Sequence, residues 1–162
     1  MSTEPARVRL SLLDRLVDES PRQPEAHPGT WGGSTEAFRD AFLRDLEWLL
    51  NTRRVPDPVP ELYPEACRSV YYYGLPDVTS LSADAPDAHQ RLAREIEECI
   101  RIFEPRLVSA RVLVAPDDSR ERRVRFVIDG VLRMDPHTER IVLDTVLETP
   151  TGKFLLAGDA HA

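Results

Sequence analysis

The feature that most constrains the fold of this chain is a change of hydrophobic period at Pro105. Before this residue, apolar side chains recur every three or four positions, and after it they alternate with polar ones. Proline has no backbone N–H to donate and disfavours helical geometry at the preceding residue, so a helix must end near Glu104. The chain therefore turns from helix to strand at a rigid corner that carries an acid, Glu104, and a base, Arg106.

Two long helices are predicted before this corner. Ser34 is suited to cap a helix that runs to about Asn51, because a serine hydroxyl accepts a hydrogen bond from the first turn. Pro86 is well placed at the first turn of a second helix that runs to Phe103, and residues 65–72 favour a short helical segment between the two. The buried faces are predicted to hold Phe38, Phe42, Leu46, Leu49 and Leu50 in the first helix, and Leu92, Ile96, Ile100 and Phe103 in the second.

Four strands are predicted after the corner, at residues 107–114, 122–134, 139–148 and 153–156. The segments between them are short and contain proline, aspartate and threonine, which is typical of hairpin turns. Helices followed by strands predict an α+β domain, with N-terminal helices packed on a C-terminal antiparallel four-stranded meander sheet. The Asp129-Gly130 pair predicts a bulge or turn inside the second strand.

Residues 1–33 are predicted to form a separate N-terminal part. Residues 8–17 place leucine and valine at helical spacing, whereas residues 19–33 are rich in proline and glycine, as linkers are. So short a helix is only marginally stable alone and needs a surface to fold against. We therefore divide the chain into an N-terminal docking helix with its Pro/Gly-rich linker, residues 1–33, and an α+β domain, residues 34–162. The helix either straps back onto its own domain or docks on a partner.

Charge and composition argue against several classes of partner. The chain has 21 basic and 28 acidic side chains and a net charge of −7, which gives no support for nucleic-acid binding. Residues 1–20 carry charges throughout and contain no apolar run of membrane-spanning length, so we expect a cytoplasmic protein without membrane insertion. Cys67 and Cys99 lack a CxxC spacing and are expected to be small buried residues in a reducing compartment.

Paired carboxylates raise the possibility of a glycoside hydrolase, which needs two of them across a sugar-binding cleft. Glu104 is a candidate acid, with Asp129 or Asp144 as the second group. However, a guanidinium two residues away, on Arg106, stabilises the ionised carboxylate, which is the wrong direction for a general acid. We therefore predict no catalytic residues and no enzymatic activity.

Metal and cofactor chemistry also lack a sequence signature. The histidines are expected in a linker, on a helix surface, in a turn and in the C-terminal tail, without the spacing of metal ligands, and they are His27, His89, His137 and His161. No glycine-rich phosphate loop occurs. The sequence predicts no metal site and no cofactor.

Four segments, in this order and at these spacings, resemble the baseplate wedge proteins of contractile injection machines, specifically the TssE component of type VI secretion systems. They are residues 44–54, 73–77, 102–107 and 126–130, and the resemblance extends from about Leu12 to Phe154. It implies a non-enzymatic structural adaptor of the baseplate that links the wedge complex to the first ring of contractile sheath and helps to initiate sheath assembly. The implied partners are the wedge proteins TssF, TssG and TssK and the sheath subunits.

The resemblance also implies which residues bind partners. The family's Glu-Pro-Arg motif is associated with attachment to the core bundle of the wedge, and Glu104, Pro105 and Arg106 match it residue for residue. The residues alone leave open an internal salt bridge that ties helix to sheet. The predicted protein-interaction residues are Glu104, Pro105 and Arg106, together with Leu12, Leu13, Arg15 and Leu16 of the docking helix.

The resemblance further implies that the sheet starts sheath growth by accepting a strand at one of its edges. No motif identifies that edge. Two other functions stay open at this point. One is a lysozyme-like enzyme that degrades peptidoglycan, and the other is a regulatory binding protein of the anti-adaptor type, which related folds can be.

Overall fold

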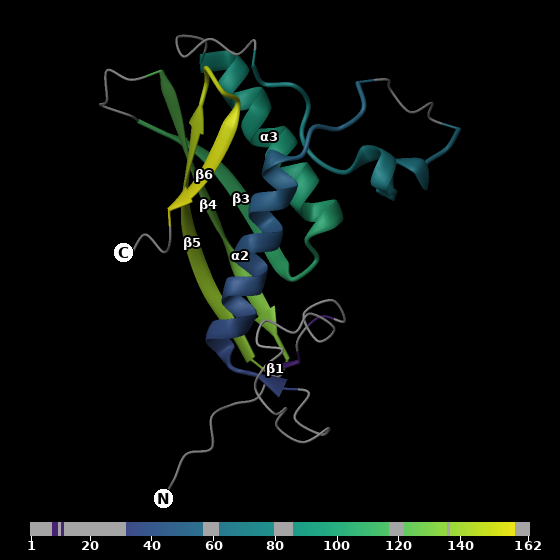
Figure 1. Cartoon of the computed structure of the whole chain (residues 1–162), viewed down its shortest axis with the longest axis vertical. Helices are drawn as coiled ribbons and strands as arrows, with labels where there is room; N and C mark the ends of the chain where they lie inside the picture. The colour runs from purple at the N-terminus through teal and green to yellow at the C-terminus, as the bar shows by residue number, and fades with distance from the viewer. Residues whose placement is uncertain are drawn as a thin grey trace, which may run out of the picture.

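The computed structural model is an α+β domain, as predicted, in which two helices cover one face of a four-stranded antiparallel sheet (Figure 1). It describes residues 8–9, 11, 32–56, 62–79, 86–116, 122–135 and 137–157. The elements are β1 (Val8–Arg9), β2 (Gly32–Gly33), α2 (Thr35–Asn51), η1 (Ala66–Arg68), η2 (Val70–Tyr72), α3 (Pro86–Phe103), β3 (Leu107–Ala115), β4 (Arg123–Met134), β5 (His137–Glu148) and β6 (Lys153–Ala157). The core lies between the helix pair and the sheet.

Helix α2 begins and ends where its sequence predicts. The Ser34 hydroxyl accepts a hydrogen bond from the Ala37 N–H at 3.0 Å, which confirms the cap. The predicted apolar stripe is buried, whereas Trp48 on its flank is 54% exposed. At the other end, the Asn51 amide donates to the Phe154 carbonyl at 3.0 Å and accepts from the Phe154 N–H at 2.9 Å. The end of α2 is thereby fixed to strand β6.

Helix α3 starts at Pro86, as predicted, and ends at Phe103. Leu92, Ile96 and Ile100 are buried against the sheet, and Phe103 is half-buried. Proline fits the first turn because its missing N–H would have no intrahelical partner there. The helix lies next to β3, so the chain reverses direction directly after it (Figure 1).

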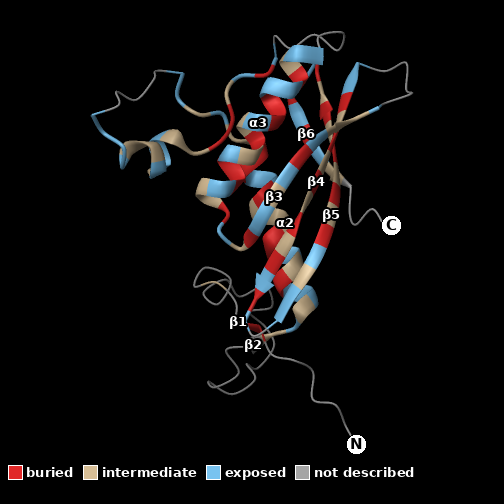
Figure 2. Ribbon diagram, turned by 180° about the vertical axis from the view of Figure 1, so that it is seen from behind, coloured by how far each residue is buried: buried red, intermediate tan, exposed pale blue. Residues whose placement is uncertain are grey.

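The sheet has the strand order β3-β4-β5-β6, which confirms the predicted meander. Strands β4 and β5 alternate between buried and more exposed residues along their length (Figure 2). That alternation places one side chain of every two against the helices. Each strand agrees with its predicted bounds to within two residues. The edges of the sheet are β3 and β6.

The predicted irregularity at Asp129-Gly130 is only partly right: β4 pairs with β5 in unbroken register through both residues, whereas its register with β3 shifts between Asp129 and Val131. The bulge lies instead in β3, between Val108 and Arg111, where Ser109 has φ 56°. Gly130 serves close packing: a Cβ there would lie 2.8 Å from Leu107 Cδ1. The glycine therefore makes room for the first residue of β3.

The N-terminal prediction is only partly tested. Val8 and Arg9 pair with Gly33 and Gly32 as two short strands, so the predicted helix does not include Val8–Arg9 and the predicted linker ends in a strand. Val8 is buried against the core because its side chain packs at the start of α2. The remaining docking-helix residues, Leu12, Leu13, Arg15 and Leu16, lie outside the described residues.

The short helix predicted at residues 65–72 is two 3₁₀ turns, η1 and η2, rather than one helical turn. They are followed by Gly74, which has φ 99° and whose Cβ would lie 2.4 Å from the Thr52 carbonyl oxygen. Only glycine tolerates both conditions. Gly74 therefore meets a backbone requirement of this turn. No helix in the described part of the chain is long and apolar enough to cross a membrane.

The two cysteines differ in exposure, which gives a chemical test of the fold. Burial raises the pKa of Cys99 to about 11, and its thiol donates a hydrogen bond to the Gly74 carbonyl at 3.4 Å; Cys67 is half-buried. We expect a thiol reagent at neutral pH to modify Cys67 in the native protein and Cys99 only after unfolding.

A pH dependence follows from the same burial. The raised pKa of Cys99 contributes stability that is fully present below its ordinary pKa of 9.0 and is lost as pH rises through about 11. Urea unfolding across this range should show Cys99→Ala losing less stability than the parent chain. Equal losses in both proteins would contradict the assignment.

Candidate functional site

The Glu104–Arg106 corner joins the end of α3 to the start of β3. The Glu104 N–H continues the helix by donating to the Ile100 carbonyl at 2.8 Å, and the Leu107 N–H donates to the Glu104 carbonyl at 3.1 Å. Pro105 lies at the outside of this turn and is exposed. The proline thus ends the helix, and the tight turn brings the Glu104 and Arg106 side chains to the same side.

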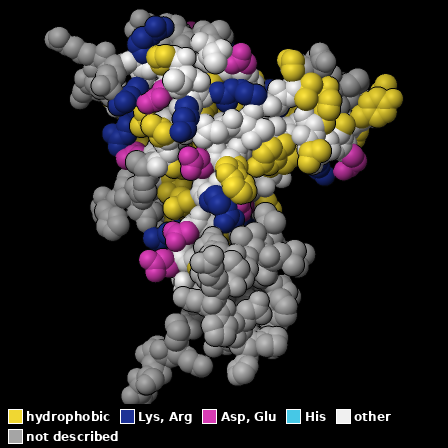
Figure 3. All heavy atoms as spheres, viewed as in Figure 1, with side chains coloured by type: hydrophobic (Ala, Val, Ile, Leu, Met, Phe, Trp, Pro, Cys, Tyr) yellow, Lys and Arg dark blue, Asp and Glu magenta, His cyan; other side chains and the backbone are white. Residues whose placement is uncertain are grey.

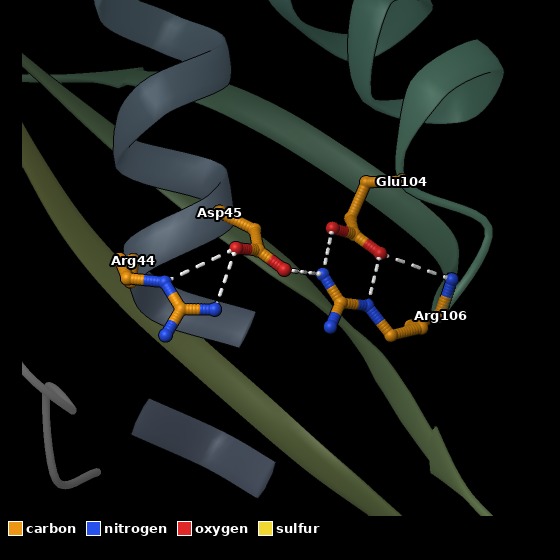
Figure 4. A network of polar contacts seen from close by, with 4 residues as sticks. All are labelled: Arg44, Asp45, Glu104 and Arg106. Carbon is orange, nitrogen blue, oxygen red and sulfur yellow. Dashed lines mark hydrogen bonds and ion pairs between the residues drawn. The ribbon is translucent and has the colours of Figure 1, made fainter. Parts of the chain in front are cut away.

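Glu104 and Arg106 form a bidentate ion pair (Figure 4). Arg106 Nε lies 2.6 Å from Glu104 Oε1, and Arg106 Nη2 lies 2.5 Å from Glu104 Oε2. The Glu104 side chain is only 6% exposed, whereas that of Arg106 is 22% exposed. A buried carboxylate is stable only when paired and hydrogen-bonded, so Arg106 is what allows Glu104 to be buried here.

Asp45 of α2 is a member of the site that sequence analysis missed. Arg106 Nη2 donates to Asp45 Oδ2 at 2.8 Å, and the other oxygen, Asp45 Oδ1, accepts from Arg44 Nε at 3.3 Å and Arg44 Nη2 at 3.1 Å (Figure 4). The sequence did contain a signal for this residue. Asp45 lies seven residues after Phe38 and three after Phe42, on the apolar stripe of its helix. An acid at such a position predicts a cationic partner.

Aromatic rings complete the surroundings of Arg106. Its guanidinium carbon lies 5.9 Å from the Phe38 ring centroid and 5.6 Å from that of Phe42. Burial alone would lower the pKa of Arg106, but hydrogen bonds and charge from Glu104 and Asp45 outweigh burial and raise it. Arg106 is therefore a permanent cation. Two acids, Glu104 and Asp45, and two bases, Arg106 and Arg44, make the network neutral.

An exposed aromatic residue lies beside this network. The Arg44 guanidinium carbon stands 5.2 Å from the Trp48 ring centroid, and Trp48 is among the most exposed large apolar side chains described. Tryptophan and arginine are enriched among the residues that dominate protein interfaces. The corner, the two ion-paired arginines and the exposed Trp48 ring together suit contact with another protein better than they suit proton transfer.

The Arg53–Arg54 pair and the segment around Gly74 link neighbouring elements of the fold. Leu75 N–H donates to the Thr52 carbonyl and Arg54 N–H donates to the Leu75 carbonyl, both at 2.9 Å. Arg53 donates to the Gly152 carbonyl in the β5–β6 turn. Arg54 pairs with Glu95 of α3 at 3.0 Å. The sequence assigned these residues no role. They connect the end of α2 to α3 and to the sheet.

The other two candidate carboxylates lie on the opposite face of the sheet from this network. Asp129 and Asp144 belong to the strand positions that face away from the helices, since their strand neighbours Ile128 and Leu143 are buried. Each is paired with an arginine: Asp129 with Arg140 at 2.9 Å and Asp144 with Arg125 at 2.5 Å. The hydrogen bond from Arg140 lowers the pKa of Asp129.

The expected position of one histidine is wrong. His89 is buried in α3 rather than on the helix surface, whereas His137 lies exposed at the start of β5, in the turn region as expected; His27 and His161 fall outside the described residues. Among the residues that the structure describes, no group of three or more His, Cys, Asp and Glu could hold a metal ion.

The decisive comparison is with protein families. The family described as "Baseplate wedge protein gp25" matches residues 36–137, which is more than half of the chain. This chain belongs to the baseplate wedge protein gp25 family. The family is a structural one, found in phage and type VI secretion baseplates, and generally non-enzymatic. No curated protein and no solved structure matches the chain.

As a gp25-family baseplate wedge protein, the chain is a structural component of a contractile injection system. The matched range runs from the first turn of α2 to the first residue of β5. It contains the complete network of Arg44, Asp45, Glu104 and Arg106. Most of β5 and all of β6 lie beyond the match.

Proposed function

We propose that this gp25-family protein is a TssE-type subunit of a type VI secretion baseplate, a cytoplasmic, non-enzymatic adaptor between the wedge complex and the first sheath ring. The observation that carries this assignment is the Glu-Pro-Arg corner, with exposed Pro105 and a preset Arg106. The proposed partners are TssF, TssG and TssK on one side and sheath subunits on the other.

The corner is proposed as the point of attachment to the wedge. Glu104 is buried and acts by positioning Arg106, so contact with a partner falls to Pro105 and Arg106. Within the described part of the chain, Arg106 Nη1 has no hydrogen-bond acceptor, whereas Nε and Nη2 are both bonded (Figure 4). A guanidinium already oriented in this way can donate to a partner's carboxylate or carbonyl with little further loss of entropy.

The docking helix is proposed as a second wedge contact on its sequence pattern alone. Its proposed contact residues are Leu12, Leu13, Arg15 and Leu16. An apolar stripe on a tether suits a partner or a neighbouring copy.

The sheath contact is proposed at a sheet edge, and β3 is the protected edge. The Val112 N–H, which points away from β4, donates to Glu97 Oε2 of α3 at 3.1 Å. The bulge at Ser109 interrupts the strand before this point. Pro116 follows the strand and has no N–H to offer. Side-chain capping, a bulge and a proline are the devices by which edges avoid strand addition.

Strand β6 is the edge proposed to accept a sheath strand. The Asn51 amide bonds the outward N–H and C=O of Phe154, as a neighbouring strand would. Two residues on, the backbone N–H and C=O of Leu156 also point away from β5. Among the described residues, these two groups have no hydrogen-bond partner. An added strand would therefore begin its pairing at Leu156.

A peptidoglycan hydrolase is less well supported. Glu104 lies on the helix side of the sheet, whereas Asp129 and Asp144 face the other side, and all three are ion-paired with arginine. A retaining or inverting hydrolase needs both carboxylates on the same cleft within about 10 Å.

Wedge attachment can be tested with two exposed prolines. Pro105→Glu puts a carboxylate next to Arg106, where it competes with a partner's acceptor, so we expect binding to a purified TssF–TssG complex to weaken roughly tenfold. Pro150→Glu, the same change at the exposed β5–β6 turn, is the matched control and should bind as the parent chain does. Absence of binding by the parent chain, or equal binding by all three proteins, would count against the proposal.

A further inference from the structure

Residues 62–73, here called the tyrosine arm, project from the body of the protein beyond α3 (Figures 1 and 2). The arm exposes apolar side chains to an unusual degree: Val70 is 92% exposed and Leu62 85% exposed, and Tyr63 and Tyr71 are exposed as well. Figure 3 shows hydrophobic side chains gathered over this projection. Exposed apolar residues that cluster, unlike single ones, mark sites of contact with other molecules.

The arm has a defined backbone conformation. Five backbone hydrogen bonds of 3.0–3.3 Å close its two 3₁₀ turns, among them Ser69 N–H to Ala66 C=O and Tyr73 N–H to Val70 C=O. The Arg54 guanidinium carbon stands 4.6 Å from the Tyr72 ring centroid while Arg54 also pairs with Glu95. These contacts fix the base of the arm. Its apolar tip is therefore presented in a preset conformation, which reduces the entropy lost on binding.

The base of the arm adjoins the Glu104–Arg106 corner. The Tyr73 ring packs edge-on against the ring of Phe103 at 5.3 Å between centroids, and Phe103 is the residue directly before Glu104. A small cavity of about 20 Å³ lies between Arg54, Tyr72 and Gly74 on the arm side and Cys99, Ile102 and Phe103 of α3. A partner that contacts the corner would thus meet the arm on the same side of α3.

We propose that the tyrosine arm is a further docking element for the wedge partner that binds the corner, with Leu62, Val70 and Tyr71 entering an apolar groove on that partner. This inference rests on the wedge attachment proposed above. A projecting apolar tip needs a concave apolar acceptor, such as the groove between two helices. The exposed charges of the arm, Glu65 and Arg68, offset each other, so apolar contact dominates recognition.

Two other occupants fit less well. A second copy of this chain would need to offer an apolar recess, but two pockets larger than the cavity beside the arm are lined mainly by charged and polar side chains, with Arg122, Arg123 and Glu148 in one and Arg133 and Asp135 in the other. A membrane surface fits poorly, because anionic lipids attract basic segments, whereas the chain carries a net charge of −7 and the arm's one base, Arg68, is offset by Glu65.

The test compares the parent chain with Leu62→Ser/Val70→Ser/Tyr71→Ser and with the single change Val70→Asp. We expect both variants to bind a purified TssF–TssG complex roughly 30-fold or more weakly than the parent, as loss of buried anchor residues does. Both should keep the parent's unfolding midpoint, because these side chains are exposed. The matched control is Leu113→Ser, which changes a side chain 62% exposed on β3 and should leave binding unchanged.

Each outcome separates the two proposals. Normal binding by both arm variants, with weak binding by Pro105→Glu, would overturn the arm's role and leave the corner in place. Absence of binding by the parent chain would reject the wedge attachment itself. Light scattering that finds a dimer of the parent chain and a monomer of Val70→Asp would show that the arm contacts a second copy, which also overturns the inference.

Discussion

Arg106→Ala is expected to lower the free energy of unfolding by about 3–5 kcal/mol, the cost of leaving a buried charge without its partner. The substitution removes both hydrogen bonds to the nearly buried Glu104 carboxylate and the bond of 2.8 Å to Asp45. It also removes a cation from above the Phe38 and Phe42 rings. Urea unfolding followed by circular dichroism measures the loss.

The matched control is Arg101→Ala. Arg101 makes two hydrogen bonds to Glu98, of 2.8 and 2.5 Å, but both side chains are more than half exposed, so solvent replaces the pair and the midpoint should barely move. Adding Glu104→Gln to Arg106→Ala should recover part of the stability, because a neutral amide costs less to bury than a carboxylate. An Arg106→Ala midpoint no lower than that of Arg101→Ala would contradict the buried pair.

This result bears on how the corner is tested for binding. A strongly destabilised variant reports poorly on an interface, since loss of wedge binding by Arg106→Ala would not separate lost stability from a lost contact. Exposed Pro105 and Val70 separate stability from attachment better than the pair does. The internal salt bridge that the sequence left open is present, and it is compatible with an attachment role for Pro105 and Arg106.

Gly74→Ala is expected to destabilise the protein by about 3 kcal/mol or more. A left-handed backbone costs about 1–3 kcal/mol for a residue with a Cβ, and overpacking adds about 1–3 kcal/mol. Here the added Cβ would lie 2.4 Å from the Thr52 carbonyl oxygen, which accepts the Leu75 N–H and cannot move without breaking that bond. Thermal unfolding of the purified variant gives the measurement.

Gly130→Ala is the informative comparison. Its Cβ would meet Leu107 Cδ1 at 2.8 Å, a side-chain atom that can shift, and its φ is not in the left-handed region. We therefore expect a smaller loss than at Gly74. If Gly130→Ala proves the more damaging change, the backbone argument for the 73–77 motif is wrong.

The sequence predicted those parts of the fold that depend on local pattern. The Ser34 cap, the Pro86 start, the apolar stripes and the switch of period at Pro105 each act within a few residues, and they place the helices and the sheet strands closely. The pairing of Val8–Arg9 with Gly32–Gly33 was missed because it joins segments more than twenty residues apart and each strand has only two residues. No periodicity can be read from so short a strand.

The sequence predicted two members of the candidate site, Glu104 and Arg106, and missed Asp45. Glu104 and Arg106 are near neighbours in sequence, so their pairing could be foreseen as an alternative. Asp45 comes from another helix, and only its place on an apolar stripe hinted at a buried partner. The exposure of Val70 could not be predicted from the sequence. An apolar residue next to three tyrosines is typical of a buried core, and only the structure shows that the arm points away from that core.

The most direct test of the adaptor role is sheath assembly on reconstituted baseplates with one edge of the sheet blocked at a time. Leu156→Pro removes an outward N–H of β6 without removing a ladder bond to β5, and Val114→Pro does the same on β3, where Val112 has the same orientation. Unfolding midpoints confirm that both variants are folded. We predict that electron microscopy finds sheaths on baseplates that contain Val114→Pro and none on those that contain Leu156→Pro. Normal sheath assembly with Leu156→Pro would contradict the proposed link between wedge and sheath.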